Sequence, residues 1–442
     1  MESIARGSSD YEAARRSAVW NARTPERFPE VIVKARSDED VIVAVREARA
    51  AGRRVTVRSG GHSWAGHQLR DGVTLIDLSE LNSIASVNRE EMTAVVEPGC
   101  HGTDLVAELD KFDLFFPIGH CPGVGLGGFL LQGGFGWHSR ELGPACMSVI
   151  GVEVVTADGE LVRASADEHP DLYWAARGSG PGFFGVVLRF HLRVYPKPKL
   201  TVAATYLYPV ELLDEVYSWM HAIGPDVAVQ MEMQAVAHHS FDGNGLEIAL
   251  LGPVFADSEE EARETLAILE TCPVLDRAKA AVPYMPLTME HFSAMVQANL
   301  PDDHRYGVDN MWTHAAASDL IPEIQKTVDA IPEAPSHLLW MNWAPSHPDT
   351  PARPDMAYSV EDEIYIAAYG VWTDASHDEA NVQWATERMR AMEGFASGIQ
   401  LADENLDHRT ARFMSDENYA RYDKIRAAYD PDQLFCSWPS RP

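Results

Sequence analysis

In the N-terminal part of the chain, short apolar runs alternate with stretches of helical spacing. Residues 28–33 form an apolar run typical of a strand, and Ser37 ahead of three acidic residues predicts the start of a helix over residues 41–51. The run at residues 54–57 predicts another strand, and a further helix is expected over residues 103–111. This pattern predicts βα units.

The second half of the chain has a different pattern, which begins after Pro196-Lys197-Pro198. Two prolines around one residue stiffen a linker and stop a strand, so this tripeptide is the expected domain boundary. Beyond it, apolar runs predict strands over residues 201–208, 229–236, 245–251, 338–343 and 363–372. Helical spacing predicts helices over residues 210–221, 258–271, 320–330, 378–392 and 415–429. Helices interleaved with strands favour an antiparallel sheet backed by helices.

Two glycine-dense loops interrupt these elements. The first, residues 58–66, contains Gly60, Gly61 and His62 and follows a predicted strand. The second, residues 119–136, holds Cys121 and has eight glycines within eighteen residues. Consecutive glycines allow positive φ and let N–H groups converge on an anion, which suits a large phosphate-bearing cofactor. The spacing is not that of a Gly-x-Gly-x-x-Gly turn that opens one helix, so a nicotinamide dinucleotide fold is a poor match.

Composition excludes several classes of protein. The chain of 442 residues is long enough for two domains, and its formal net charge of −30, from 36 basic and 66 acidic side chains, argues against a nucleic-acid-binding protein. The charge weakly favours a neutral or cationic substrate, but an acidic surface that keeps the protein soluble is the preferred explanation.

The cysteines and the N-terminal residues indicate the cellular compartment of the protein. Five cysteines, an odd number without metal-type spacing, argue against a disulfide framework. Arg15-Arg16 lacks the apolar run of an export signal, and the sequence has no apolar run of the length that spans a membrane. We therefore expect a cytoplasmic protein with no membrane partner.

The two loops carry a family resemblance. Arg-Ser-Gly-Gly-His-Ser at residues 58–63 and Cys-Pro-Gly-Val-Gly at 121–125 resemble motifs of the FAD-linked oxidases of the vanillyl-alcohol oxidase superfamily, most closely the berberine-bridge-enzyme-like branch. In that branch the histidine bonds the flavin C8 methyl and the cysteine bonds C6, so the resemblance implies FAD attached covalently to both His62 and Cys121. The likeness is carried further by residues 72–79, 152–159, 171–178, 183–187 and 429–435.

The resemblance also implies a fold and a set of cofactor-binding positions. The expected fold is α+β, with a two-part FAD-binding domain of the PCMH type over residues 1–197. A substrate domain over 198–409 would have an antiparallel sheet backed by helices, and residues 410–442 would return to the FAD-binding domain. The expected cofactor-binding residues are Arg58, Ser59, Gly60, Gly61, His62, Ser63, Gly66, His67, Cys121, Val124, Gly125, Gly127, Gly128, Gly133, Gly134, Gly136, Gly185 and Val186.

The electron acceptor is predicted from Val124, three residues after Cys121. The resemblance places a gate for oxygen there, where valine goes with oxidases and isoleucine with dehydrogenases. The alternative is a valine that only packs the loop. The predicted partners are a small-molecule substrate and molecular oxygen, with hydrogen peroxide as product, in a monomer or homodimer.

The catalytic base departs from the family pattern. Plant relatives often carry a glutamate after the tyrosine that corresponds to Tyr365, but Ile366 follows here, and a second tyrosine of the family corresponds to Asp403. Asp403 is the first candidate, because a buried carboxylate beside the flavin can act as a base when its pKa rises. Glu404, Tyr365 and Tyr369 are the next candidates. The alternative is that Asp403 and Glu404 form a solvated acidic turn.

The substrate cavity is expected to be aromatic and rich in methionine, which suits a phenolic, alkaloid or polyketide-like molecule. Its expected lining is Tyr284, Met285, Met289, His291, Phe292, Trp312, His314, Trp340, Met341 and Trp343, although such residues more often form plain core. The predicted function is therefore an FAD-dependent oxidase of an alcohol, amine or phenol. The alternatives are a flavoprotein dehydrogenase or cyclase with another acceptor, a flavin-binding protein without turnover, and a zinc hydrolase, for which no His-Glu-x-x-His motif is present.

Overall fold

Two sheets form the N-terminal part of the protein, whose structure is a computed structural model that describes residues 1–240 and 243–439. The first sheet has the strand order β1 (Glu2–Ala5), β2 (Val31–Lys34), β4 (Thr74–Asp77), β3 (Val55–Arg58), and β4 pairs in parallel with β2 and β3. The second is an antiparallel sheet of β5 (Ile84–Asn88), β6 (Thr93–Val96), β10 (Val186–Arg193), β8 (Val149–Val155) and β9 (Leu161–Ala164). A third, two-stranded antiparallel sheet consists of β7 (Leu114–Phe115) and β11 (Tyr195–Pro196).

Short helices connect these strands. They are α1 (Tyr11–Ser17), α2 (Asp38–Ala50), α3 (Gly102–Asp110), α4 (Leu126–Leu131), α5 (Ser139–Leu142) and α6 (Pro170–Ala175). The Ser37 hydroxyl accepts a hydrogen bond from the Asp40 N–H, so Ser37 caps α2 as expected. The helix begins at Asp38, earlier than the sequence pattern predicted, because the acidic residues form its first turn.

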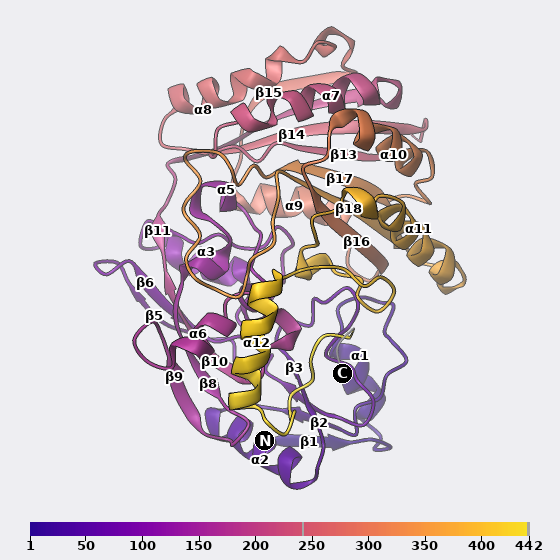
Figure 1. The fold of residues 1–442 in the computed structure, drawn as a ribbon. Coiled ribbons are helices and arrows are strands. Elements are labelled where there is room, and N and C mark those ends of the chain that lie inside the picture. The colour runs from indigo at the N-terminus through magenta and orange to yellow at the C-terminus, as the bar shows by residue number, and fades with distance from the viewer. Residues whose placement is uncertain (241–242, 440–442) are drawn as a thin grey trace.

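The remaining large element is a seven-stranded antiparallel sheet (Figure 1). Its order is β15 (Ala280–Pro286), β12 (Leu200–Pro209), β14 (Leu246–Ala256), β13 (Gln234–His239), β17 (His337–Asn342), β18 (Ile364–Trp372) and β16 (Arg305–Thr313). The associated helices are α7 (Leu213–Ile223), α8 (Glu259–Leu266), α9 (Met289–Asn299), α10 (Ala317–Asp329) and α11 (Asp378–Ala391). The α+β prediction, with an antiparallel sheet backed by helices, is confirmed.

The two faces of this sheet have different neighbours. On β18, Ile364, Ile366 and Ala368 join the core formed with the helices, among them α7, α10 and α11. The alternate residues Tyr365 and Tyr369 point to the opposite face, as the two-residue period of a strand requires. That second face therefore faces the N-terminal part of the protein, and we call the seven-stranded sheet the roof sheet.

The C-terminal segment lies against the N-terminal part. Helix α12 (Asp416–Tyr429) packs beside α6, where the Arg421 guanidinium lies 4.4 Å from the Trp174 ring, and it runs along the front of the lower half of Figure 1. The chain then pairs with β3 through the Val55 N–H, which donates to the Leu434 carbonyl at 2.7 Å. The C-terminal segment thus returns to the N-terminal part of the chain.

Sequence patterns missed three elements between residues 280 and 313, namely β15, α9 and β16. The strand expected at 229–236 lies at β13, and the helix expected at 258–271 ends at Leu266 and continues as a 3-10 turn to Thr271.

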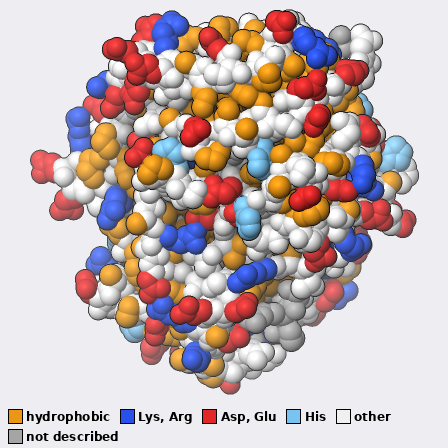
Figure 2. Space-filling model, turned by 45° about the horizontal axis from the view of Figure 1, so that its top comes forward, with side chains coloured by type: hydrophobic (Ala, Val, Ile, Leu, Met, Phe, Trp, Pro, Cys, Tyr) orange, Lys and Arg blue, Asp and Glu red, His pale blue; other side chains and the backbone are white. Residues whose placement is uncertain are grey.

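The acidic side chains are dispersed over the face shown in Figure 2, so the surplus of negative charge is not gathered at one place on it.

Candidate functional site

A cavity of about 620 Å³ lies between the roof sheet and the N-terminal part. The strands β12, β13, β14, β17 and β18 line it from above, both glycine loops line it from below, and Phe435 and Cys436 close it beside β3. The predicted cofactor-binding residues that line it are Arg58, Ser59, Gly60, Gly61, His62, Ser63, His67, Cys121, Val124, Gly125, Gly127, Gly128 and Gly185. The structure thus brings both loops and the predicted substrate domain to one space.

Five predicted cofactor-binding residues lie outside this lining: Gly66, Gly133, Gly134, Gly136 and Val186. Val186 is buried in β10, where it pairs with Val155. The glycines allow close packing behind the cavity wall, since a Cβ on Gly136 would lie 1.9 Å from the Ile118 carbonyl oxygen. Gly133, Gly134 and Gly136 thus shape the second loop, whereas Gly66 ends the first loop, where a Cβ would lie 2.7 Å from Pro25.

The two loops meet backbone to backbone. A Cβ on Gly60 would lie 2.5 Å from the Gly125 nitrogen, and a Cβ on Gly125 would lie 2.5 Å from the Gly60 nitrogen. The Ser59 hydroxyl also accepts a hydrogen bond from the Gly128 N–H at 3.2 Å. Only glycine at both positions permits this approach, so the junction fixes the loop of His62 against the loop of Cys121.

His62 lies among aromatic rings at the cavity wall. Its imidazole stacks on Trp20 with ring centroids 4.2 Å apart, and the Trp64 ring meets it edge-on at 5.7 Å. Its Nε2 atom is enclosed and has no hydrogen-bond partner among the described residues. Burial lowers the pKa of His62 to about 4, so the imidazole is neutral at physiological pH.

Cys121 lines the same cavity and packs against the cluster that contains Trp64. Burial, with a smaller contribution from the charge of Asp403, raises the pKa of its thiol to about 12. Because the thiolate is the reactive form of cysteine, bond formation at this sulfur requires a proton acceptor. All five cysteines are unpaired in the structure.

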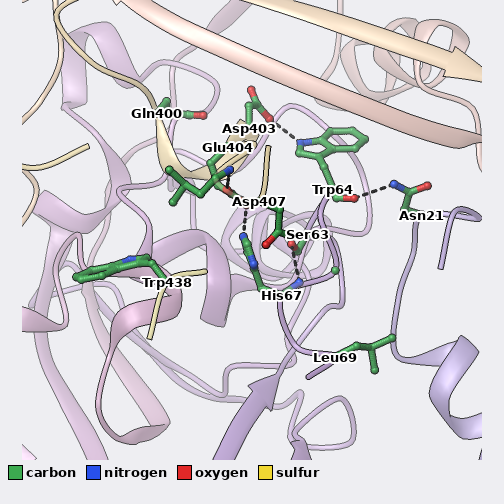
Figure 3. Close-up of polar contacts among 12 residues, drawn as sticks. Asn21, Ser63, Trp64, His67, Leu69, Gln400, Asp403, Glu404, Asp407 and Trp438 are labelled. Carbon is green, nitrogen blue, oxygen red and sulfur yellow. Dashed lines mark hydrogen bonds and ion pairs between the residues drawn. The ribbon is translucent and has the colours of Figure 1, made fainter. Parts of the chain in front are cut away.

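Asp403 is the centre of a cluster of hydrogen-bond donors at the cavity wall. Its Oδ2 accepts from the hydroxyls of Tyr365 at 2.5 Å and Tyr369 at 2.8 Å. Its Oδ1 accepts from Trp64 Nε1–H at 2.6 Å, as Figure 3 shows. Burial and the nearby carboxylate raise the pKa of both tyrosines well above its usual value, so both hydroxyls stay protonated and donate. The geometry therefore favours Asp403 over the two tyrosines as proton acceptor.

Glu404 points away from this cluster. It is buried, does not line the cavity, and its carboxylate is paired with His67 Nε2 and accepts from the Leu406 N–H. Neither residue forms the solvated turn considered from the sequence, and that alternative is wrong. The pair between Glu404 and His67 ties the segment with Asp403 to the chain directly after the first glycine loop (Figure 3).

A second set of contacts ties the Asp403 segment to the roof sheet. On β16, Asn310 Nδ2–H donates to the Asp403 carbonyl at 2.7 Å and to the Gln400 carbonyl at 3.1 Å. The neighbouring Asp309 is fully buried, and its Oδ1 accepts a hydrogen bond from Arg409 Nη2–H at 2.5 Å. Asp403 is thus held from the cofactor side by Trp64 and from the roof by Asn310.

The cavity is lined by only some of the aromatic, methionine and histidine residues that the sequence predicted for the substrate site. Of that set, Phe292, Trp312 and Met341 line the cavity, whereas Trp340 points into the opposite core and His314 is exposed beside Asp362. Sequence reasoning missed His337, whose ring stacks on Tyr369 at 4.8 Å and whose Nδ1 lies 3.0 Å from the Pro335 carbonyl oxygen. Burial lowers the pKa of His337 to about 4, so it is neutral.

Two further observations concern other classes of site. In the described parts of the chain, no group of three or more His, Cys, Asp or Glu side chains is arranged to hold a metal ion. Within those same residues, no helix has both the length and the apolar composition to cross a bilayer.

Comparison with known proteins agrees with this geometry. The family model described as "FAD binding domain" matches residues 29–165. An FAD-linked oxidoreductase from Hypoxylon pulicicidum is 32% identical over 432 residues, which cover 96% of this chain and 93% of that protein. It therefore resembles the chain over nearly its whole length.

Solved structures show the same fold. The BBE-like 1 protein of Physcomitrella patens has a TM-score of 0.86 at 20% identity, over 100% of this chain and 96% of that one. Phl p 4, named a glucose dehydrogenase in its wild-type form, has a TM-score of 0.82 at 19% identity over 100% of this chain and 96% of that one. An isoleucine-to-valine variant of Phl p 4 is named a glucose oxidase.

Proposed function

Because the chain belongs to the FAD-linked oxidoreductases of the vanillyl-alcohol oxidase superfamily, we propose that it is an oxidase with FAD attached covalently to His62 and Cys121. It oxidises a hydroxyl- or amine-bearing small molecule and passes the electrons to oxygen, which is reduced to hydrogen peroxide. The observation that carries the proposal is one cavity lined by His62, Cys121 and Asp403.

The chain's residues fit a bound flavin in three ways. The cavity is long enough to reach from Phe435 beside β3 to Tyr369 under the roof. Its floor is a glycine cradle in which Cβ atoms at Gly60 or Gly125 would collide with backbone. The neutral His62 has an enclosed Nε2 with no hydrogen-bond partner among the described residues, so no hydrogen bond at that atom explains its burial. Phosphate groups would face the N–H groups of the loops.

FAD bound here would accept a hydride from a substrate C–H and pass the electrons on to oxygen. The chain supplies the proton transfer that accompanies this chemistry. The Asp403 carboxylate accepts the proton of the substrate hydroxyl or amine, while Tyr365, Tyr369 and Trp64 hold its two oxygens in place. Tyr365, Tyr369 and Trp64 are themselves buried, whereas Asp403 is partly exposed toward the cavity.

The cavity wall limits the class of substrate. Among the described lining residues contributed by the roof strands, none is Lys or Arg, and the carboxylate of Asp403 faces the same space. Arg58 and Arg70 line the cavity among the N-terminal residues, so an anionic substrate beside Asp403 would meet a negative charge with no compensating cation from the roof strands. Leu207, Val236 and Leu251 make much of the roof apolar, so we propose a neutral or cationic substrate with an apolar body.

This substrate class is tested by a peroxide assay of the purified protein with a panel of alcohols, amines and phenols, each paired with its carboxylated analogue. Turnover is expected only with neutral or cationic members. Preferred turnover of the anionic analogues would contradict the proposal. Reduction of the protein's flavin without peroxide would instead point to a dehydrogenase.

Val124 is the residue on which the choice of oxygen as acceptor rests. It lines the cavity, and a Cβ built on Gly119 would lie 3.7 Å from the Val124 Cβ, which is an ordinary van der Waals contact. The two forms of Phl p 4 show that a single isoleucine-to-valine change accompanies a change of name from dehydrogenase to oxidase. Valine at this gate supports the oxidase proposal.

Replacing Val124 with isoleucine is expected to slow reoxidation by oxygen about tenfold or more, which corresponds to about 1.4 kcal/mol of barrier. The added methyl group narrows the path to the flavin. The protein is reduced photochemically without substrate, mixed with oxygenated buffer, and followed by stopped-flow absorbance. Val124→Ala is the matched control and should keep or raise the wild-type rate. Equal rates for the isoleucine variant and wild type would remove Val124 as the gate.

A further inference from the structure

Trp20 covers the face of the His62 imidazole, although it lies far from the glycine loops in the sequence. We propose that Trp20 is a positioning residue for covalent attachment of FAD at His62. It fixes the plane of the imidazole so that a ring nitrogen meets the C8 methyl carbon. This inference rests on the proposed attachment at His62 and goes beyond it, because it assigns a role to a residue outside both cofactor motifs.

The rings form a continuous stack. The His62 and Trp20 centroids are 4.2 Å apart with planes 17° from parallel, and Trp20 lies in turn on Tyr306, with centroids 4.8 Å apart and planes at 28°. Such offset-parallel packing restricts ring rotation. Trp64 closes the side of the stack, at 5.4 Å from Trp20 and nearly perpendicular to it.

Trp20 is itself held at three points. Its indole Nε1–H donates to Asp302 Oδ1 at 2.9 Å, and its backbone N–H donates to the Gly61 carbonyl at 2.9 Å, immediately before His62. The Tyr306 ring beneath it is fully buried, and its hydroxyl donates to the Pro301 carbonyl. Because Trp20 cannot shift freely, it acts as a fixed support for the imidazole.

The imidazole needs such a support because hydrogen bonding does not hold its outer nitrogen. Nε2 is enclosed without a partner among the described residues, so no hydrogen bond at that atom fixes the ring angle. The stack restricts the ring together with a hydrogen bond between the imidazole and the backbone of His62 itself. The same apolar surroundings keep the ring neutral, as nucleophilic attack requires.

The bond-forming step balances with oxygen as oxidant. A bond forms between a ring nitrogen of His62 and the C8 methyl carbon, while the imidazole N–H and one methyl C–H are broken. The two protons and the electron pair released pass, by way of the flavin, to molecular oxygen, which becomes hydrogen peroxide. Trp20 takes no part in the electron transfer and acts only on the approach of the two reacting atoms.

The test isolates the His62 bond in a Cys121→Ala background, where acid-stable flavin arises only from His62. Apoprotein is mixed with FAD in air, and samples are acid-precipitated over time and analysed by intact mass. Adding Trp20→Leu is expected to slow attachment by about tenfold to 100-fold, as expected when a reacting group loses its position. Trp20→Phe retains a stacking ring and is expected to stay close to the parent rate.

Controls separate the possible failures. Trp219→Leu removes a tryptophan from α7, on the far face of the roof sheet, and should leave the attachment rate unchanged. If Trp20→Leu fails to bind FAD at all, Trp20→Met, which keeps volume without a planar ring, takes its place. Attachment at the parent rate in the leucine or methionine variant would overturn the role of Trp20. A Cys121→Ala parent that never gains acid-stable flavin would instead overturn the proposed His62 bond.

Discussion

Replacing Asp403 with asparagine is expected to lower the rate of substrate oxidation by about 10²–10⁴-fold, the range that loss of a positioned general base produces. Asparagine has the same shape and keeps acceptor capacity at one atom, but it cannot take a proton at neutral pH. Tyr365, Tyr369 and Trp64 would still surround it, so the cavity keeps its form. The rate is measured anaerobically as bleaching of the flavin by a substrate identified in the peroxide screen.

Two matched variants distinguish the base from its supports. Tyr369→Phe removes one donor to Asp403 but leaves the carboxylate, so a smaller loss of rate is expected. Glu404 lies outside the cavity lining, so Glu404→Gln, which alters its pair with His67, is expected to lower stability more than the rate of flavin reduction. Asp403→Asn with the wild-type reduction rate would show that another group accepts the proton.

Replacing Gly60 with alanine is expected to abolish FAD binding. The new Cβ would lie 2.5 Å from the Gly125 nitrogen and 2.8 Å from its Cα, so the backbones of the two cofactor loops must separate. Backbone cannot move aside as the end of a flexible side chain can, and the cavity floor would open. The flavin absorbance of the purified protein, relative to its absorbance at 280 nm, measures the loss.

The control for this prediction is Gly394→Ala, because no atom lies within 4 Å of a Cβ built there and its φ is not positive. That variant should retain full flavin content and wild-type stability. A Gly60→Ala protein with a full complement of flavin would show that the loops do not need this close approach.

Local patterns predicted elements with local causes and missed those that depend on distant partners. Helix α2 was predicted because Ser37 and the acidic first turn lie next to each other. Strand β16 was missed because Asp309 and Asn310 are buried polar residues in its centre. Their partners, Arg409 and Gln400, lie some hundred residues later, so nothing near β16 indicates that burial is tolerated there.

Strand β15 was missed for a different reason. It contains Pro283 and is largely exposed, so it lacks both the apolar alternation and the composition of a strand. Its place at the edge of the sheet, beside β12 alone, is what tolerates proline. Edge position is a property of the finished sheet and is not visible in the residues themselves.

The site shows the same division. His62 and Cys121 lie in loops whose glycine pattern predicts a cofactor site, and both residues line the same cavity in the structure. The hydrogen bond from Trp64 to Asp403 joins residues 339 positions apart, and the stack of Trp20 on His62 has no sequence signal beyond the presence of a tryptophan. Both cofactor loops were therefore predictable, whereas the groups that orient His62 and Asp403 were not.

The most direct test of the account is the intact mass and visible absorbance of the protein after acid precipitation, for wild type, His62→Ala, Cys121→Ala and the double variant. Two attachment points predict that one FAD remains on the wild type and on each single variant, and that it is lost from the double variant alone. Flavin released by acid from the wild type, or lost from both single variants, would contradict bicovalent attachment.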